Sequence, residues 1–140
     1  MSFGIPRRFL GLSCALALSG CGEKMKDAGA VADKFVDTYY VESDQASAMA
    51  LTSGVASLRL RDELKLANEG RGGGALRDLR QVRVYYKRGS IEGQGDARST
   101  VYRLDIRPQG GGSLSRDARL ELTRLPDGTW RVSRFSETNP

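Results

Sequence analysis

The chain of 140 residues contains no histidine and only two cysteines. The lack of histidine excludes a Ser-His-Asp triad and any histidine-based metal site, and two cysteines are too few for a zinc finger or a disulfide scaffold. We therefore expect no metal ion and no cofactor. Hydrophobic residues make up 39% of the chain and charged residues 28%, which is enough apolar material for a packed core in one domain. No stretch of the sequence identifies a reaction.

The first twenty residues have the features of a targeting segment. Arg7 and Arg8 precede an apolar stretch at residues 9–18, as in a secretory signal peptide. That stretch is shorter than the roughly 20 residues that a bilayer-spanning helix needs. It leads into Leu18-Ser19-Gly20-Cys21, which resembles the lipobox of bacterial lipoproteins. The resemblance implies attachment of a diacylglyceryl group to the Cys21 thiol, cleavage before Cys21 and acylation of the new amino terminus. The alternative is an ordinary signal peptide with a chance cysteine at its end.

Lipidation would divide the chain into a signal peptide (1–20), a short tether (21–25) and a single domain (26–136). The domain would then lie at the cell envelope, facing the periplasm and close to the membrane. In lipoproteins an aspartate after the modified cysteine favours retention in the inner membrane. Gly22 occupies that position here, which favours the outer membrane. With Cys21 acylated, no free thiol would remain for a disulfide, a nucleophile or a thiolate metal site.

The first half of the expected domain has helical periodicity. Apolar residues recur at spacings of three and four over residues 26–41, which predicts an amphipathic helix. Ser43-Asp44 can cap a second, short helix that ends near Leu51. A third helix is expected over residues 55–69, and its inward-facing side chains would be Leu58, Leu60, Leu64 and Ala67. The glycine-rich residues 71–74 predict a flexible joint and lack the features of a phosphate-binding loop.

After Ala75 the apolar period changes from 3.6 to 2, which predicts four half-buried strands. Gly-rich links and the turn signal Pro126-Asp127-Gly128 separate them, so the strands should form an antiparallel meander. We therefore predict an α+β fold, with N-terminal helices packed on one side of a curved sheet. The inward-facing side chains would be Val82, Val84, Tyr86, Tyr102, Leu104, Ile106, Ala118, Leu120, Leu122, Trp130 and Val132.

Basic residues concentrate in the predicted sheet. Residues 71–140 hold fourteen basic and eight acidic side chains, whereas residues 21–70 hold six basic and nine acidic ones. Alternation places several of the basic residues on the polar side of the sheet, with Asp105 and Glu121 among them. This surface could bind an anionic lipid or an acidic partner, or it could be a solvated face held soluble by ion pairs. Its candidate residues are Arg83, Lys87, Arg103, Arg107, Arg119 and Arg131.

The order of elements resembles the nuclear-transport-factor-two-like superfamily, also called cystatin-like cones. Residues 32–40 resemble its first helix, and residues 126–132 its final hairpin and strand. The resemblance implies a cone whose open mouth holds a small molecule or a partner segment. Enzymes of the superfamily use an Asp or His base there. The nearest candidates in this sequence are Asp37 with Tyr39 or Tyr40, as an acid/phenol pair or as a pocket rim; the alternative is that Asp37 is solvated and the tyrosines belong to the core.

These patterns together predict a non-enzymatic lipoprotein of the cell envelope. It would be anchored to the membrane through Cys21 and would bind an envelope protein or a small ligand through the cone. One alternative is a docking subunit of an envelope assembly that uses the basic face. Another is an isomerase-like or cyclase-like enzyme, which the lack of histidine disfavours. Nucleic acid is not expected as a partner, because the domain would lie outside the cytoplasm.

Overall fold

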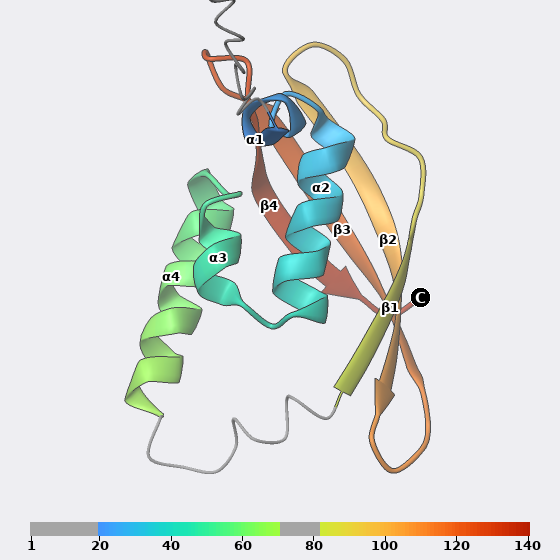
Figure 1. Ribbon diagram of the computed structural model, residues 1–140. Coiled ribbons are helices and arrows are strands. Elements are labelled where there is room, and N and C mark those ends of the chain that lie inside the picture. The colour runs from blue at the N-terminus through green and yellow to red at the C-terminus, as the bar shows by residue number, and fades with distance from the viewer. Residues whose placement is uncertain (1–19, 71–81) are drawn as a thin grey trace, which may run out of the picture.

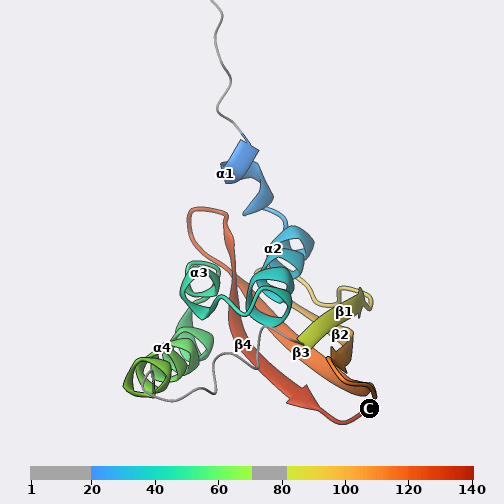
Figure 2. The same ribbon diagram turned by 60° about the horizontal axis from the view of Figure 1, so that its bottom comes forward.

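The computed structural model describes residues 20–70 and 82–140. The predicted signal peptide up to residue 19 and the predicted joint at 71–74 lie outside these residues. Helices cover one side of a four-stranded antiparallel sheet, and Figures 1 and 2 show the two layers from different sides. The predicted α+β architecture is confirmed. Within the described residues, no helix has both the length and the apolar character required to cross a membrane.

The sheet is a meander in the order β1-β2-β3-β4. Its strands are β1 (Val82–Arg88), β2 (Ala97–Pro108), β3 (Leu114–Arg124) and β4 (Trp130–Thr138). All four predicted strands are present, and the predicted inward residues of β2 to β4 face the helices. The alternation ends in β4, where a bulge opposite Glu121 and Leu122 inserts one extra residue, Ser133. Because of this bulge, Phe135 turns inward and is buried.

The helical layer begins with α1 (Gly20–Lys24) and α2 (Ala28–Val36), and α2 continues directly into the π-helical turn η1 (Asp37–Val41). Then follow the short α3 (Gln45–Met49) and the longer α4 (Gly54–Glu69). Aspartate side chains cap two of these helices, since Asp27 accepts from the Gly29 N–H at 2.9 Å and Asp44 from the Ser47 N–H at 3.0 Å. The predicted helices at 26–41, 43–51 and 55–69 therefore match the structure closely.

One predicted helix face is wrong in part. Leu60 is fully buried, whereas Leu58 is 55% exposed, and Leu64 and Ala67 are half-buried. The buried side of α4 passes through Ala56 and Leu60, four residues apart. Two residues span about 200° of an α-helix, so Leu58 points away from that side.

A single core fills the space between the layers. Phe35 of α2 packs there with Leu104, Leu120 and Trp130 of the sheet, while Tyr39 and Val84 are half-buried at its margin. The outer edge of β4 is covered in part, because the segment after α3 forms a parallel bridge between Thr52 and Val132. The segment predicted as a tether is largely helical, because α1 covers it up to Lys24. The Met25 carbonyl at its end accepts a hydrogen bond from the Trp130 N–H at 2.7 Å, which joins this end of the chain to the start of β4.

Candidate functional site

The helix that begins at Ala28 changes from α to π geometry at Asp37. In η1 the Glu42 N–H donates to the Asp37 carbonyl at 2.8 Å, a hydrogen bond that spans five residues. This turn carries Tyr39 and Tyr40, whose ring centroids lie 4.7 Å apart in an edge-to-face arrangement. Single π-helical turns within α-helices are frequent at functional sites. Here the turn places two adjacent phenols at the end of α2, against the core.

Each of these phenols donates to a different carboxylate. Tyr39 Oη lies 2.8 and 2.9 Å from the carboxylate oxygens of Glu63 on α4, and Tyr40 Oη lies 2.5 Å from Oε1 of Glu137 on β4. Arg59 joins the two carboxylates, because its Nε donates to Glu63 at 2.9 Å and its Nη2 donates to Glu137 at 3.2 Å. We call these five residues the Arg59 cluster.

The Arg59 guanidinium also rests on Phe135. Its central carbon lies 4.0 Å from the centroid of the Phe135 ring, and Nη1 donates to the Phe135 carbonyl at 3.1 Å. The Phe135 ring in turn lies 5.0 Å from the Phe35 ring. The planar guanidinium therefore has apolar contact on its face and carboxylates at its edges, which fixes its position.

A second polar cluster joins the other side of α2 to the sheet. Tyr102 Oη on β2 donates to Asp33 at 2.6 Å, and Tyr86 Oη on β1 donates to Asp37 at 2.8 Å. Arg88 donates to the second carboxylate oxygen of Asp33 at 2.8 Å. We call these five residues the Arg88 cluster. The two clusters hold α2 and η1 on both sides through four phenol–carboxylate hydrogen bonds.

The pKa of each of these phenols is raised. Burial is the largest cause for Tyr39, Tyr40 and Tyr102, and the carboxylate that each phenol contacts adds to it. Burial and the hydrogen bond to Asp37 raise the pKa of Tyr86 to about 12. The four phenols therefore stay protonated at neutral pH. In this form they donate hydrogen bonds to the carboxylates.

The residues named as candidates for an acid/phenol pair have different partners in the structure. Asp37 accepts from Tyr86 and belongs to the Arg88 cluster, whereas Tyr39 and Tyr40 contact the glutamates of the Arg59 cluster. All three residues are half-buried. Their role as the rim of a pocket stays a prediction.

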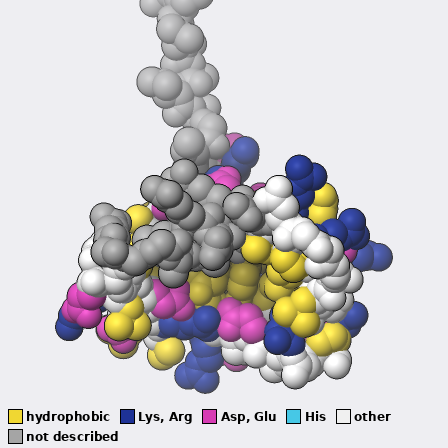
Figure 3. All heavy atoms as spheres, turned by 90° about the horizontal axis from the view of Figure 1, so that it is seen from below, with side chains coloured by type: hydrophobic (Ala, Val, Ile, Leu, Met, Phe, Trp, Pro, Cys, Tyr) yellow, Lys and Arg dark blue, Asp and Glu magenta, His cyan; other side chains and the backbone are white. Residues whose placement is uncertain are grey.

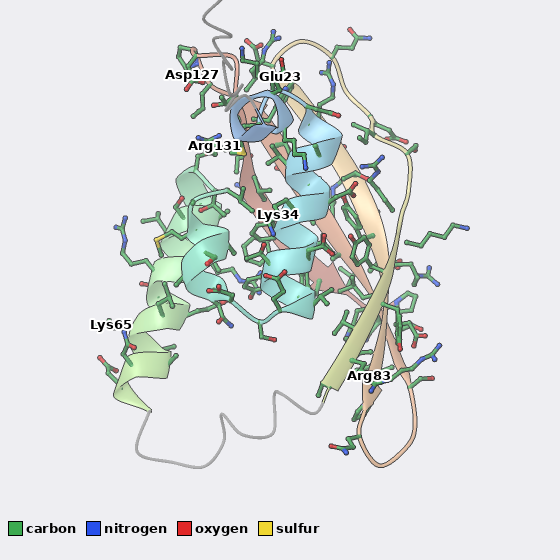
Figure 4. All side chains as sticks on the ribbon, in the orientation of Figure 1. Glu23, Lys34, Lys65, Arg83, Asp127 and Arg131 are labelled. Atoms are coloured by element: carbon green, nitrogen blue, oxygen red, sulfur yellow. The ribbon has the colours of Figure 1, made fainter. Side chains whose placement is uncertain are left out.

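The six candidate basic residues lie on the side of the sheet opposite the helices, which we call the outer face. Arg83 pairs across strands with Arg107, and Lys87 with Arg103. Arg119 lies opposite Val101, and Arg131 opposite Thr123. Figure 4 labels Arg83 near the start of β1 and Arg131 near the start of β4, so the set extends from one edge strand to the other.

Acidic side chains neutralise only part of this set. Arg103 forms a 2.5 Å ion pair with Asp117, and Arg107 forms a 2.6 Å ion pair with Asp105. Among the residues that the structure describes, no carboxylate lies within 4.0 Å of the side-chain nitrogens of the other four. Those four are Arg83, Lys87, Arg119 and Arg131.

The described surface has several concave regions. A groove with a volume of about 640 Å³ lies beside α2 and is lined by Met25, Val31 and Leu51, with Asp33 and Lys34 among its charged residues. Two smaller hollows, of about 250 and 140 Å³, lie on the sheet side and share Arg119, Ser99 and Glu92 as lining residues. Within the described part of the chain, no three Cys, Asp or Glu side chains lie close enough together to hold a metal ion.

Figure 3 shows the molecule from below, at the end where η1 finishes and β1 begins. Hydrophobic side chains gather in the middle of this face, with acidic and basic side chains beside them. Three apolar side chains of the inner sheet, Val84, Tyr86 and Ile106, pack on the core but remain half-buried. Apolar surface is therefore left at the margin of the core near the Arg88 cluster.

Comparison with known structures identifies the fold. The chain resembles the crystal structure of a ketosteroid isomerase-like protein from Erwinia carotovora atroseptica, with a TM-score of 0.56 and 13% sequence identity. The match covers 85% of this chain and 99% of the other. No family model and no curated protein matches the sequence. The chain thus has the ketosteroid isomerase-like, or nuclear-transport-factor-two-like, α+β cone fold, as the sequence resemblance predicted.

Three residues of the Arg59 cluster were not among the predicted site residues. Arg59 and Glu63 stand four residues apart on a predicted helix, a spacing typical of helical ion pairs, so this contact could have been found. Glu137 lies 97 residues from Tyr40 in the sequence. Only the packing of η1 against the end of β4 brings these two together, and no local pattern indicates it.

Proposed function

We propose that this chain is a non-enzymatic lipoprotein of the cell envelope. It is anchored by acylated Cys21, faces the periplasm, and sits in the outer membrane. Its cone domain binds a small ligand or a short segment of an envelope protein. The lipobox residues Leu18-Ser19-Gly20-Cys21 support the anchoring.

One observation carries the binding part of the proposal. The half-buried apolar side chains Val84, Tyr86 and Ile106 lie beside phenols and carboxylates that are already oriented by hydrogen bonds. Sites for small ligands usually combine such apolar walls with a few fixed polar groups. Because the phenols of the two clusters donate to carboxylates, their oxygens can still accept a hydrogen bond from a ligand.

The same geometry favours binding over catalysis. An enzyme of this fold would need a free base in the cone, and the lack of histidine leaves that task to a carboxylate. Asp33 and Asp37 each accept a phenol hydrogen bond, and Asp33 also pairs with Arg88. We expect groups held in this way to orient a ligand.

Native mass spectrometry of the protein purified from membranes in mild detergent tests the binding proposal. Wild type should carry the mass of a non-covalently bound ligand in addition to the mass of the acylated chain. Ile106→Trp fills the apolar surface on the inner side of β2 and should lose that mass. Val101→Trp adds the same side chain on the outer side of the same strand and should retain it. A wild-type protein without a bound mass, or equal behaviour of the two variants, would overturn the binding proposal.

Incorporation of labelled palmitate tests the anchor independently. Cys21→Ser should abolish the label and leave the leader uncleaved, because no other side chain forms the thioether. Cys14→Ser, in the leader itself, is the matched control and should behave as wild type. Normal processing and membrane attachment of Cys21→Ser would contradict the proposed location.

A further inference from the structure

The outer face carries a large excess of positive charge. Cross-strand pairing and alternation place seven basic side chains on it, since Arg134 of β4 joins the six already described. Among the described residues, four acidic side chains share this face, namely Asp105, Asp117, Glu121 and Glu92, which is bridged to Ser99 and lines a hollow together with Arg119. The ion pairs of Arg103 and Arg107 use two of these carboxylates.

The remaining cations differ from those on the helical side. Arg59 and Arg88 both lie in clusters where carboxylates accept their hydrogen bonds. On the outer face, Arg83, Lys87 and Arg119 are exposed, and no carboxylate of the described residues lies within 4.0 Å of their side-chain nitrogens. They come from β1 and β3, so the unneutralised charge is spread across the sheet.

Apolar side chains are interspersed with these cations. Tyr85 is 49% exposed and Val101 is 40% exposed, and both belong to the outer face. The Arg107 guanidinium lies 4.9 Å from the centroid of the Tyr85 ring. Arginine side chains next to exposed tyrosine and valine form an amphipathic surface, with apolar stems and rings beneath charged ends. Such a surface fits the boundary between phosphate groups and acyl chains.

The position of the chain's amino-terminal end brings a bilayer within reach. α1, which includes Cys21, lies at the end of the molecule where β4 begins (Figure 1). The Met25 carbonyl accepts from the Trp130 N–H at 2.7 Å, and Arg131 of the outer face follows Trp130. An acyl chain on Cys21 would hold this corner of the sheet at the membrane.

From this charge, composition and placement we propose that the outer face binds the phosphate groups of anionic phospholipids. The planar guanidinium fork matches a phosphate, and Arg83, Arg119 and Arg131 can each engage one. The source of the phosphate is the bilayer that takes the anchor, so this step rests on the proposed acylation of Cys21. The domain then lies with its sheet toward the membrane and its helices away from it.

A fluorescent probe on the outer face tests this orientation. Val101→Cys, labelled with a polarity-sensitive dye, reports on the outer face, and Leu66→Cys reports on exposed α4 on the helical side. Cys14 would leave with the leader and Cys21 would carry lipid, so the introduced thiol is the one labelled. Each purified protein is mixed with vesicles of phosphatidylcholine alone, or of three parts phosphatidylcholine to one part phosphatidylglycerol.

With vesicles that contain phosphatidylglycerol, the emission maximum of the dye at position 101 should shift to the blue. The emission of the dye at position 66 should not change. Salt should reverse the shift, because surface charges are screened over about 8–10 Å at physiological ionic strength. The double variant Arg83→Glu with Arg119→Glu should lower the apparent affinity for these vesicles, followed by the same dye, at least about twentyfold. This figure takes roughly fivefold for each basic residue near an anionic surface. Arg61→Glu with Lys65→Glu on α4 is the matched control and should leave the response intact.

Several results would overturn this proposal. These are no response at position 101 to phosphatidylglycerol, an equal response at both positions, or a full response in the double outer-face variant. A response to soluble polyglutamate without a response to vesicles would assign the face to an acidic protein instead. Flotation with phosphatidylcholine vesicles alone reports the acyl anchor, so failure of the anchor and failure of the face are distinguished.

Discussion

Tyr40 and Glu137 stand 97 residues apart in the sequence, yet the phenol oxygen of Tyr40 lies 2.5 Å from a carboxylate oxygen of Glu137. This hydrogen bond joins the π-helical turn to the end of the last strand. Arg59 of α4 donates to the same carboxylate. The π-helical turn η1, helix α4 and the last strand β4 therefore meet at the Glu137 side chain.

Tyr40→Phe removes only the hydroxyl that donates to Glu137. Glu137 keeps its contact with Arg59, so we expect a loss of about 1 kcal/mol in the free energy of unfolding, which is typical of one hydrogen bond. Urea denaturation at neutral pH measures it. Tyr85→Phe, on the exposed outer face, is the control and should change stability by less than about 0.5 kcal/mol. Equal effects of the two substitutions would mean that the Tyr40–Glu137 contact does not stabilise the fold.

Arg59→Met should destabilise more than Tyr40→Phe. It keeps the apolar contact with Phe135 but leaves Glu63 and Glu137 without their shared cation. We expect a loss of about 1–3 kcal/mol, because partly buried charged groups lose their partner. Arg61→Met, at an exposed position on the same helix, should be nearly neutral. A neutral Arg59→Met would show that Arg59 is dispensable for joining α4 to β4.

The raised pKa of Tyr86 makes stability depend on pH in the alkaline range. In the unfolded chain this phenol ionises near its ordinary pKa of 10.0, whereas in the folded protein its pKa is about 12. Between these values the folded state holds more protons than the unfolded state, so stability is complete below pH about 10 and falls as pH rises toward 12. Urea denaturation across this range should show a shallower fall for Tyr86→Phe than for wild type. Parallel profiles would contradict the shifted pKa.

The corrected face of α4 predicts different effects for two leucines. Leu60→Ala opens a cavity at a fully buried position and should cost about 2–5 kcal/mol. Leu58→Ala changes a side chain that is 55% exposed and should cost less than about 0.5 kcal/mol. The difference in urea midpoint between the two variants measures this directly. A larger effect of Leu58→Ala would restore the face that the sequence pattern suggested.

The elements of this fold were predictable because their signals are local. Asp44 caps α3 as expected, and the alternation around Tyr102 and Leu104 identified β2 and its inward side. The wrong face of α4 is a local error, because Leu58 and Leu60 are two residues apart and cannot share one side of a helix. Other features depend on contacts between distant segments and have no local signal. The bulge at Ser133 turns Phe135 inward and breaks the period of two, which no residue of β4 indicates on its own.

The candidate site was less predictable than the fold for the same reason. Tyr39, Tyr40 and Asp37 were recognised as chemically interesting side chains, but their partners depend on how α2 lies across the sheet. Asp37 reaches Tyr86, 49 residues away, and does not pair with the tyrosines beside it in the sequence. The periodicity of a helix shows which of its sides is buried. It does not show which side chains of the sheet that side contacts.

The proposed location depends on the sulfur of Cys21 carrying the membrane anchor. Mass spectrometry of the amino-terminal tryptic peptide from the native protein tests it most directly. Acylation of Cys21 predicts a peptide of four residues, Cys21 to Lys24, whose mass is increased by a diacylglyceryl group and an amide-linked acyl chain. A peptide that begins upstream of Cys21, or one with an unmodified thiol at position 21, would show that Cys21 does not carry the anchor.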